Sequence, residues 1–108
     1  MSEIDEILQA VDRLHGALAD LVLRGLRSAG PAQLAPLEAL REEFDRVGAG
    51  HLAGRVAELL DAARRDDRSA AAALLRAQTS LRLFERVFTL ERAADLLGPL
   101  AAPAEGEA

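Results

Sequence analysis

The chain contains no cysteine, lysine, tryptophan or tyrosine, and only three of its 108 residues are phenylalanine. The absence of cysteine excludes disulfide bonds, a thiol nucleophile and thiolate metal ligands. Because lysine is absent, all 13 basic residues are arginine. Together with the abundance of alanine and leucine, this usage indicates the coding bias of a GC-rich, bacterial genome.

Positive charge is also in deficit, since the formal net charge is −5 at pH 7. A chain of this sign has no general attraction for phosphate backbones or anionic lipids, so we expect neither a nucleic-acid nor a membrane partner. Glu3, Asp5 and Glu6 stand where a signal peptide would carry basic residues, and no long uncharged run follows them. We therefore expect a cytoplasmic protein.

The residues that are present favour helices. Half of the chain is apolar, mostly alanine and leucine, and these residues, like arginine and glutamate, have high helix propensity. β-Branched residues are scarce. The length suits one domain with one core, so the composition predicts an all-α fold.

The first helix is expected to begin at Ser2 as N-cap and to end at residues 28–31, where Gly30 can adopt positive φ. Its apolar residues keep a spacing of three and four for about three heptads. These residues are Ile4, Ile7, Val11, Leu14, Leu18 and Leu21. They can form either an intrachain core or a seam with another chain, and Gly25 in the same stripe would allow close approach.

Further apolar stripes over residues 34–47 and 52–63 predict two short helices, separated by Gly48–Gly50. Two topologies fit this pattern: an antiparallel bundle of four helices, or a bundle of three helices whose middle arm is broken at Gly48–Gly50. The last helix should begin after a cap at Asp67 or Ser69 and run to Leu97, before Gly98-Pro99. Residues 1–98 then form one helical bundle domain, and residues 99–108 form a disordered tail.

The last helix has a wider apolar face than one ordinary core contact requires. On a helical wheel its large apolar side chains sweep roughly 200°, whereas a helix lying on a core needs about 100° or somewhat more. Two interpretations remain open: the helix is central with neighbours on both sides, or one flank packs against another chain. The candidate interface residues are Leu83, Val87, Leu90, Glu91, Ala94 and Leu97.

Glu91 is the polar member of this set. If it were buried it would need a partner such as an arginine from another helix or chain. Alternatively, it lies near the end of the bundle, where it needs no partner.

Residues capable of catalysis do not form a recognisable motif. His15 and His51 are isolated, with no HExxH or other zinc spacing. The chain also lacks a nucleophile elbow and a glycine-rich phosphate loop. We therefore assign no catalytic, cofactor-binding or metal-binding residue and expect no enzymatic activity and no cofactor.

The sequence hence favours a small helical protein–protein interaction module. It would act as a homodimer, or as an accessory or adaptor subunit of a larger bacterial complex, through the apolar flank of its C-terminal helix. The alternative is a regulatory bundle that binds a small ligand in an apolar pocket near Phe44, Phe84 and Phe88.

Overall fold

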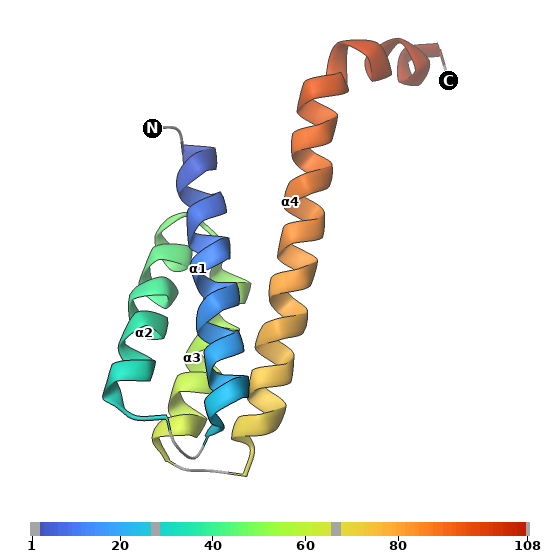
Figure 1. Ribbon diagram of the computed structural model, residues 1–108. Helices are drawn as coiled ribbons and strands as arrows, with labels where there is room; N and C mark the ends of the chain where they lie inside the picture. The colour runs from blue at the N-terminus through green and yellow to red at the C-terminus, as the bar shows by residue number, and fades with distance from the viewer. Residues whose placement is uncertain (1–2, 27–28, 66–67, 108) are drawn as a thin grey trace.

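The structure is a computed structural model that describes residues 3–26, 29–65 and 68–107, with side chains as far as Leu97. It consists of four helices, α1 (Glu3–Arg24), α2 (Pro31–Arg46), α3 (Gly50–Arg64) and α4 (Ala70–Glu107) (Figure 1). No strand occurs in these ranges. The predicted all-α fold is thus confirmed. The expected caps Ser2 and Asp67 lie outside the described residues.

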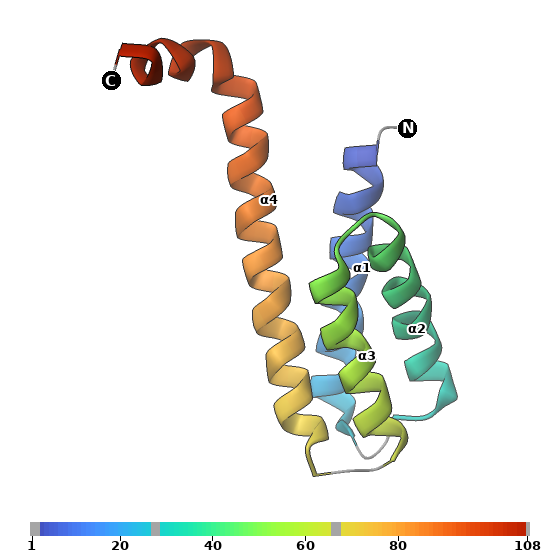
Figure 2. The same ribbon diagram turned by 180° about the vertical axis from the view of Figure 1, so that it is seen from behind.

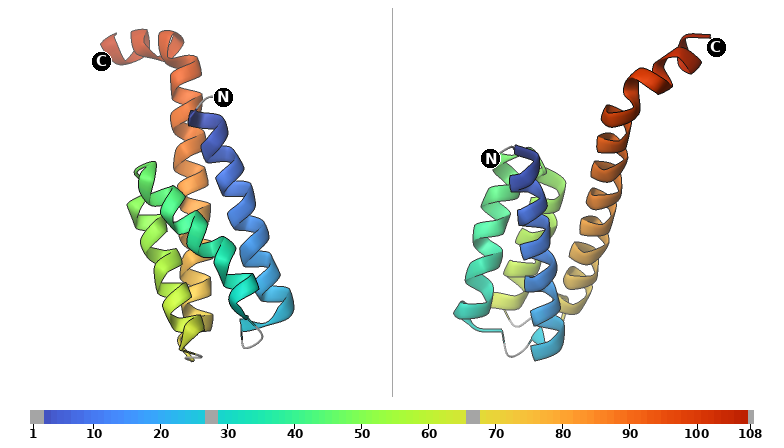
Figure 3. Two further views of the ribbon diagram at one scale, coloured as in Figure 1. Left: turned by 90° about the vertical axis from the view of Figure 1, so that its left-hand side faces the viewer. Right: turned by 45° about the horizontal axis from the view of Figure 1, so that its top comes forward.

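Consecutive helices run antiparallel and pack side by side (Figure 2). In particular, α2 and α3 form a hairpin instead of a single arm laid end to end. The bundle therefore has four helices, and the alternative with three helices and a broken middle arm is wrong. The α1–α4 contact is less extensive than those between consecutive helices, so the bundle is more open on that side (Figure 3).

The hairpin between α2 and α3 is produced by a glycine cap. Gly48 has φ +89°, the left-handed region that glycine adopts without a steric penalty. Its N–H donates to Asp45 O at 3.2 Å, and the N–H of Ala49 donates to Phe44 O at 2.8 Å. These two bonds form a Schellman motif, which satisfies the last carbonyl groups of α2 while the chain reverses direction.

The first helix ends earlier than the sequence suggested, and at a different glycine. Gly25, with φ +86°, donates its N–H to Leu21 O at 2.8 Å and so caps α1 after Arg24. Gly30 has φ −101°, and its N–H donates to Gln33 Oε1 at 2.9 Å at the start of α2. The expectations of positive φ at Gly30 and of Gly25 as part of the helical stripe are therefore wrong.

The core lies between the four helices and accounts for most of the predicted stripes. Val11, Leu14, Leu18 and Leu21 of α1 are buried, so most of that stripe packs within the chain. Ile4 at its beginning is 40% exposed. The buried core residues of the other helices include Leu37, Leu40, Phe44, Leu52, Val56, Leu59, Leu60, Ala77 and Leu81.

The fourth helix extends beyond the ends of the other three (Figures 1 and 3). Its backbone remains helical to Glu107, so the predicted end before Gly98-Pro99 is wrong. The ribbon instead bends sharply towards its C-terminal end (Figure 1). A proline lacks the amide hydrogen and crowds the preceding turn, which explains a bend in this part of the helix. The disordered tail over residues 99–108 stays a prediction.

Candidate functional site

The two flanks of α4 differ sharply in exposure. Its inner flank carries buried residues that pack on the bundle: Ala70, Ala73, Leu74, Ala77, Ser80 and Leu81. The other flank is exposed, with Leu83 at 56%, Val87 at 53%, Leu90 at 62% and Leu97 at 54%. Ala94 and Glu91 are exposed as well. The bundle thus buries only part of the wide apolar arc.

The length of α3 explains why α4 has no neighbour from α3 beyond Val87. Because α3 begins at Gly50 and runs antiparallel to α4, its first residues lie level with Leu83 and Val87. Beyond that level α4 continues without α3 beside it (Figure 1). Glu91 lies one turn beyond Val87 and is exposed, in agreement with its interpretation as a residue near the bundle end.

The exposed apolar residues are those predicted from the sequence as one flank of this helix, and they follow a heptad pattern. Leu83, Val87, Leu90, Ala94 and Leu97, here called the α4 seam, are spaced by four, three, four and three residues. In heptad notation Val87 and Ala94 occupy position a, and the three leucines occupy position d. The spacing of three and four is the same as in the α1 stripe, so the register of this flank can be read from the sequence as well.

The phenylalanines attach α4 to the bundle at the level of the α2–α3 turn. Phe44 of α2 is fully buried, and its ring meets that of Phe84 edge-on at a centroid distance of 5.9 Å. Phe84 in turn stacks on Phe88, with centroids 5.9 Å apart and planes inclined by 8°. These contacts orient α4 so that the seam faces away from the core.

A shallow depression adjoins the lower edge of the seam. It has a volume of about 300 Å³ and is lined by the α2–α3 turn, His51, Ser80, Leu83, Phe84 and Val87. The predicted ligand pocket near the phenylalanines corresponds most closely to this depression. The three rings themselves, however, pack against one another.

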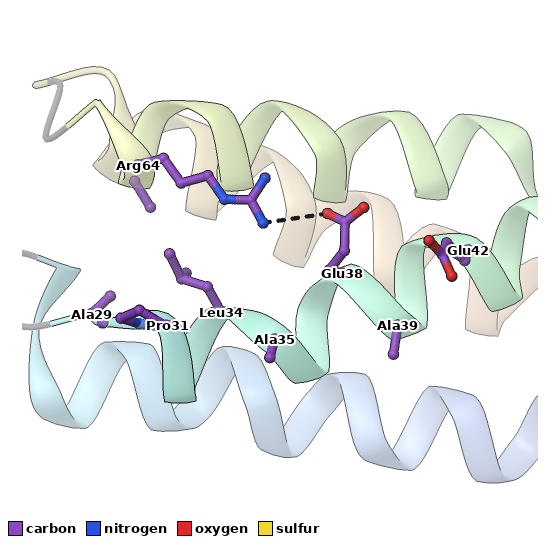
Figure 4. Close-up of a pocket in the computed structure, with 10 residues that line it drawn as sticks. Ala29, Pro31, Leu34, Ala35, Glu38, Ala39, Glu42 and Arg64 are labelled. Carbon is purple, nitrogen blue, oxygen red and sulfur yellow. Dashed lines mark ion pairs between the residues drawn. The ribbon is translucent and has the colours of Figure 1, made fainter.

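A second pocket, of about 650 Å³, lies between α2 and α3 at the opposite end of the bundle. Its wall carries Pro31, Leu34 and several alanines, with Glu38 and Arg64 across from one another (Figure 4). Glu38 accepts a hydrogen bond from Arg41 at 2.5 Å, and its other oxygen lies 3.6 Å from Arg64 Nη2. The hydrogen bond from Arg41, supported by the positive charge of Arg64, lowers the pKa of Glu38 from its ordinary value of 4.5. The negative charge of this carboxylate is therefore already balanced by two arginines.

The two histidines occupy separate places. His15 of α1 pairs with Glu85 of α4 and so links two helices whose contact is less extensive than those between consecutive helices. His51 is the second residue of α3 and lies exposed beside the seam. Among the described residues, no three histidine or acidic side chains gather closely enough to hold a metal ion. Over the same residues, none of the helices has the length and apolar character needed to span a membrane.

Comparison with protein-family models, with curated proteins and with solved structures gives no match to this chain.

Proposed function

We propose that this protein is a helical protein–protein interaction module that binds its partner through the α4 seam. The observation that supports the proposal is the exposure of the three leucines and Val87, each more than half accessible, along one face of one helix. Contiguous exposed apolar surface of this kind marks interaction sites in proteins.

The free energy available from burying the seam supports the same proposal. Burial of one such side chain stabilises a protein by roughly 1.5–3 kcal/mol. Four half-exposed side chains thus leave several kcal/mol unused, against a total stability of about 5–15 kcal/mol for a small domain. A partner that covers the seam would recover this free energy as binding affinity.

The polar groups of the bundle favour binding over catalysis. Arg13 and Glu43 pair at 2.9 Å, Arg55 and Glu58 at 3.2 Å, and Glu38 is held between two arginines. Such pairs are typical of a solvated surface. A bacterial, cytoplasmic setting is part of the same proposal, and the cysteine-free composition is compatible with a reducing compartment.

The proposal is tested by charging the seam. We expect Leu83→Glu/Leu90→Glu to keep its helical circular dichroism and to lose less than about 1 kcal/mol of stability, because both positions are exposed. The variant should lose assembly in size-exclusion chromatography with light scattering. Leu96→Glu is the matched control, since Leu96 is 76% exposed on α4 but lies outside the seam.

Two results would contradict this function. Unfolding of the double variant would mean that the seam belongs to the core of one protomer. A monomeric wild-type protein that binds neither a hydrophobic dye nor any protein partner would mean that the seam has no role in binding.

A further inference from the structure

We propose that the partner is a second copy of this chain, whose α4 lies parallel to the first and in register with it over residues 83–97. This inference rests on the proposed function, because it assigns the occupant of the same seam. Three observations support it: the residue types along the seam, the charges that flank it, and the position of the seam on a side of α4 that the bundle does not cover.

The residue types are those of a two-stranded parallel coiled coil. A β-branched residue at position a with leucine at position d favours two parallel strands. The seam has Val87 at a and Leu83, Leu90 and Leu97 at d. Ala94 at the second a position is small, so the two backbones can approach closely there. Towards the bundle the seam stops at Leu83, since the preceding a and d positions are Ser80 and Arg76, which are not apolar.

The flanking charges match between two parallel copies. With Val87 at a, Arg86 occupies position g and Glu91 position e of the next heptad. In a parallel, in-register pair, g of one helix meets the following e of the other. Arg86 of each protomer then faces Glu91 of its partner, which gives two ion pairs related by symmetry. Within the described residues, both side chains are exposed and neither forms an ion pair.

An antiparallel pair would not satisfy these charges. In that arrangement g faces g and e faces e, so Arg86 would meet Arg86 or Ala93. Glu91 would likewise meet Glu91 or Phe84. Charge complementarity therefore favours the parallel orientation over the antiparallel one.

The fold leaves the seam accessible to a second copy, and it holds α4 in a helical conformation before association. The seam and the inner flank of α4 are separated by about 120° around the helix. In a parallel pair the two bundles would therefore lie on the outer sides, at the same end of the coiled coil. The helix is already ordered by its packing on α3 and by the Phe44–Phe84 contact. A short seam then suffices, because association need not nucleate the helix.

The first test exchanges the flanking charges. Arg86→Glu and Glu91→Arg should each weaken self-association by on the order of tenfold, because each replaces two attractive pairs with two like-charge contacts. The double variant Arg86→Glu/Glu91→Arg should restore it. An equimolar mixture of the two single variants should also associate, since each chain then offers the complementary charges. Arg82→Glu, an exposed change of the same charge away from the seam, should have no effect.

The second test determines orientation. Because the chain has no cysteine, Ala94→Cys introduces the only thiol. A parallel, in-register pair places the two thiols together, so this variant should form a disulfide-linked dimer in air. Thr89→Cys should not form this disulfide, because Thr89 occupies position c, on the opposite side of the helix from Val87.

The outcomes separate this inference from the proposed function. A dimer that is unaffected by the charge exchange and not cross-linked through Ala94→Cys overturns the parallel arrangement. A wild-type chain that is monomeric, but binds a different protein in a manner abolished by Leu83→Glu/Leu90→Glu, overturns the second copy while the interaction module stands. A wild-type chain that neither self-associates nor binds another protein overturns both the second copy and the interaction module.

Discussion

At the scale of single residues, two glycines decide where the chain turns. Gly25 and Gly48 have positive φ and end α1 and α2. A side chain is rarely found in this conformation because its Cβ approaches the neighbouring carbonyl oxygen. Gly30 and Gly50 are extended or helical and carry no such constraint. Glycines that look equivalent in sequence thus have different structural roles.

We therefore expect glycine-to-alanine substitutions at two positions to change the stability of the fold in opposite directions. Gly48→Ala should destabilise the fold by about 1–2 kcal/mol, because alanine is strained at φ +89°. Gly54→Ala, inside α3 with open space around its Cβ, should stabilise the fold by about 0.5–1 kcal/mol. Urea unfolding followed by circular dichroism measures both. Equal effects of the two substitutions would contradict the assigned role of the Gly48 turn.

At the scale of helices, the α2–α3 contact combines apolar packing with an ion pair. Glu38 of α2 pairs with Arg41 on the same helix. It also lies 3.6 Å from Arg64 on α3 (Figure 4). Because its pKa is lowered in the folded protein, Glu38 stabilises the fold at pH values above its unfolded pKa. That contribution decreases as the pH falls below about 4.5 and through the lower folded value.

Glu38→Gln should therefore reduce the free energy of unfolding at pH 7, by less than about 1 kcal/mol because the side chain is 34% exposed. The difference from wild type should shrink as the pH is lowered towards 3. Glu42→Gln is the matched control, since Glu42 lies 3.8 Å from Arg41 and is 67% exposed. Unfolding by urea at several pH values measures the difference. A pH-independent gap between Glu38→Gln and wild type would contradict this account.

At the scale of the whole molecule, the protein is more elongated than a compact domain of the same number of residues. Its radius of gyration is 16.7 Å, with principal extents of 56 × 30 × 22 Å. A compact domain of this length has a radius of gyration of about 13 Å. The excess comes from α4, which projects past the other helices (Figure 3).

We expect the monomeric variant Leu83→Glu/Leu90→Glu to keep this extended shape. Small-angle X-ray scattering should give a radius of gyration near 16.7 Å, because α4 is held by its buried residues up to Leu81 and by the Phe44–Phe84 contact, and the variant removes none of these. A value near 13 Å would mean that α4 folds back on α1, over the partly exposed Ile4 and Leu8.

Much of the fold follows from local sequence patterns. Alanine and leucine with three–four spacing determine four helices, and the α1 stripe and the apolar positions of α2 and α3 become core. The excess apolar arc of α4 was also visible in the sequence, together with every residue of the seam. These features depend on periodicity and helix propensity, which act within one segment of the chain.

Which flank of α4 is covered was decided only by the tertiary structure. The arc contains both the inner residues around Leu81 and the outer residues around Leu90, and periodicity treats them alike. The Gly48 turn makes α2 and α3 a hairpin, and the place where that hairpin ends sets the height to which α4 is covered. Burial depends on contacts between distant segments, and no single segment contains that information.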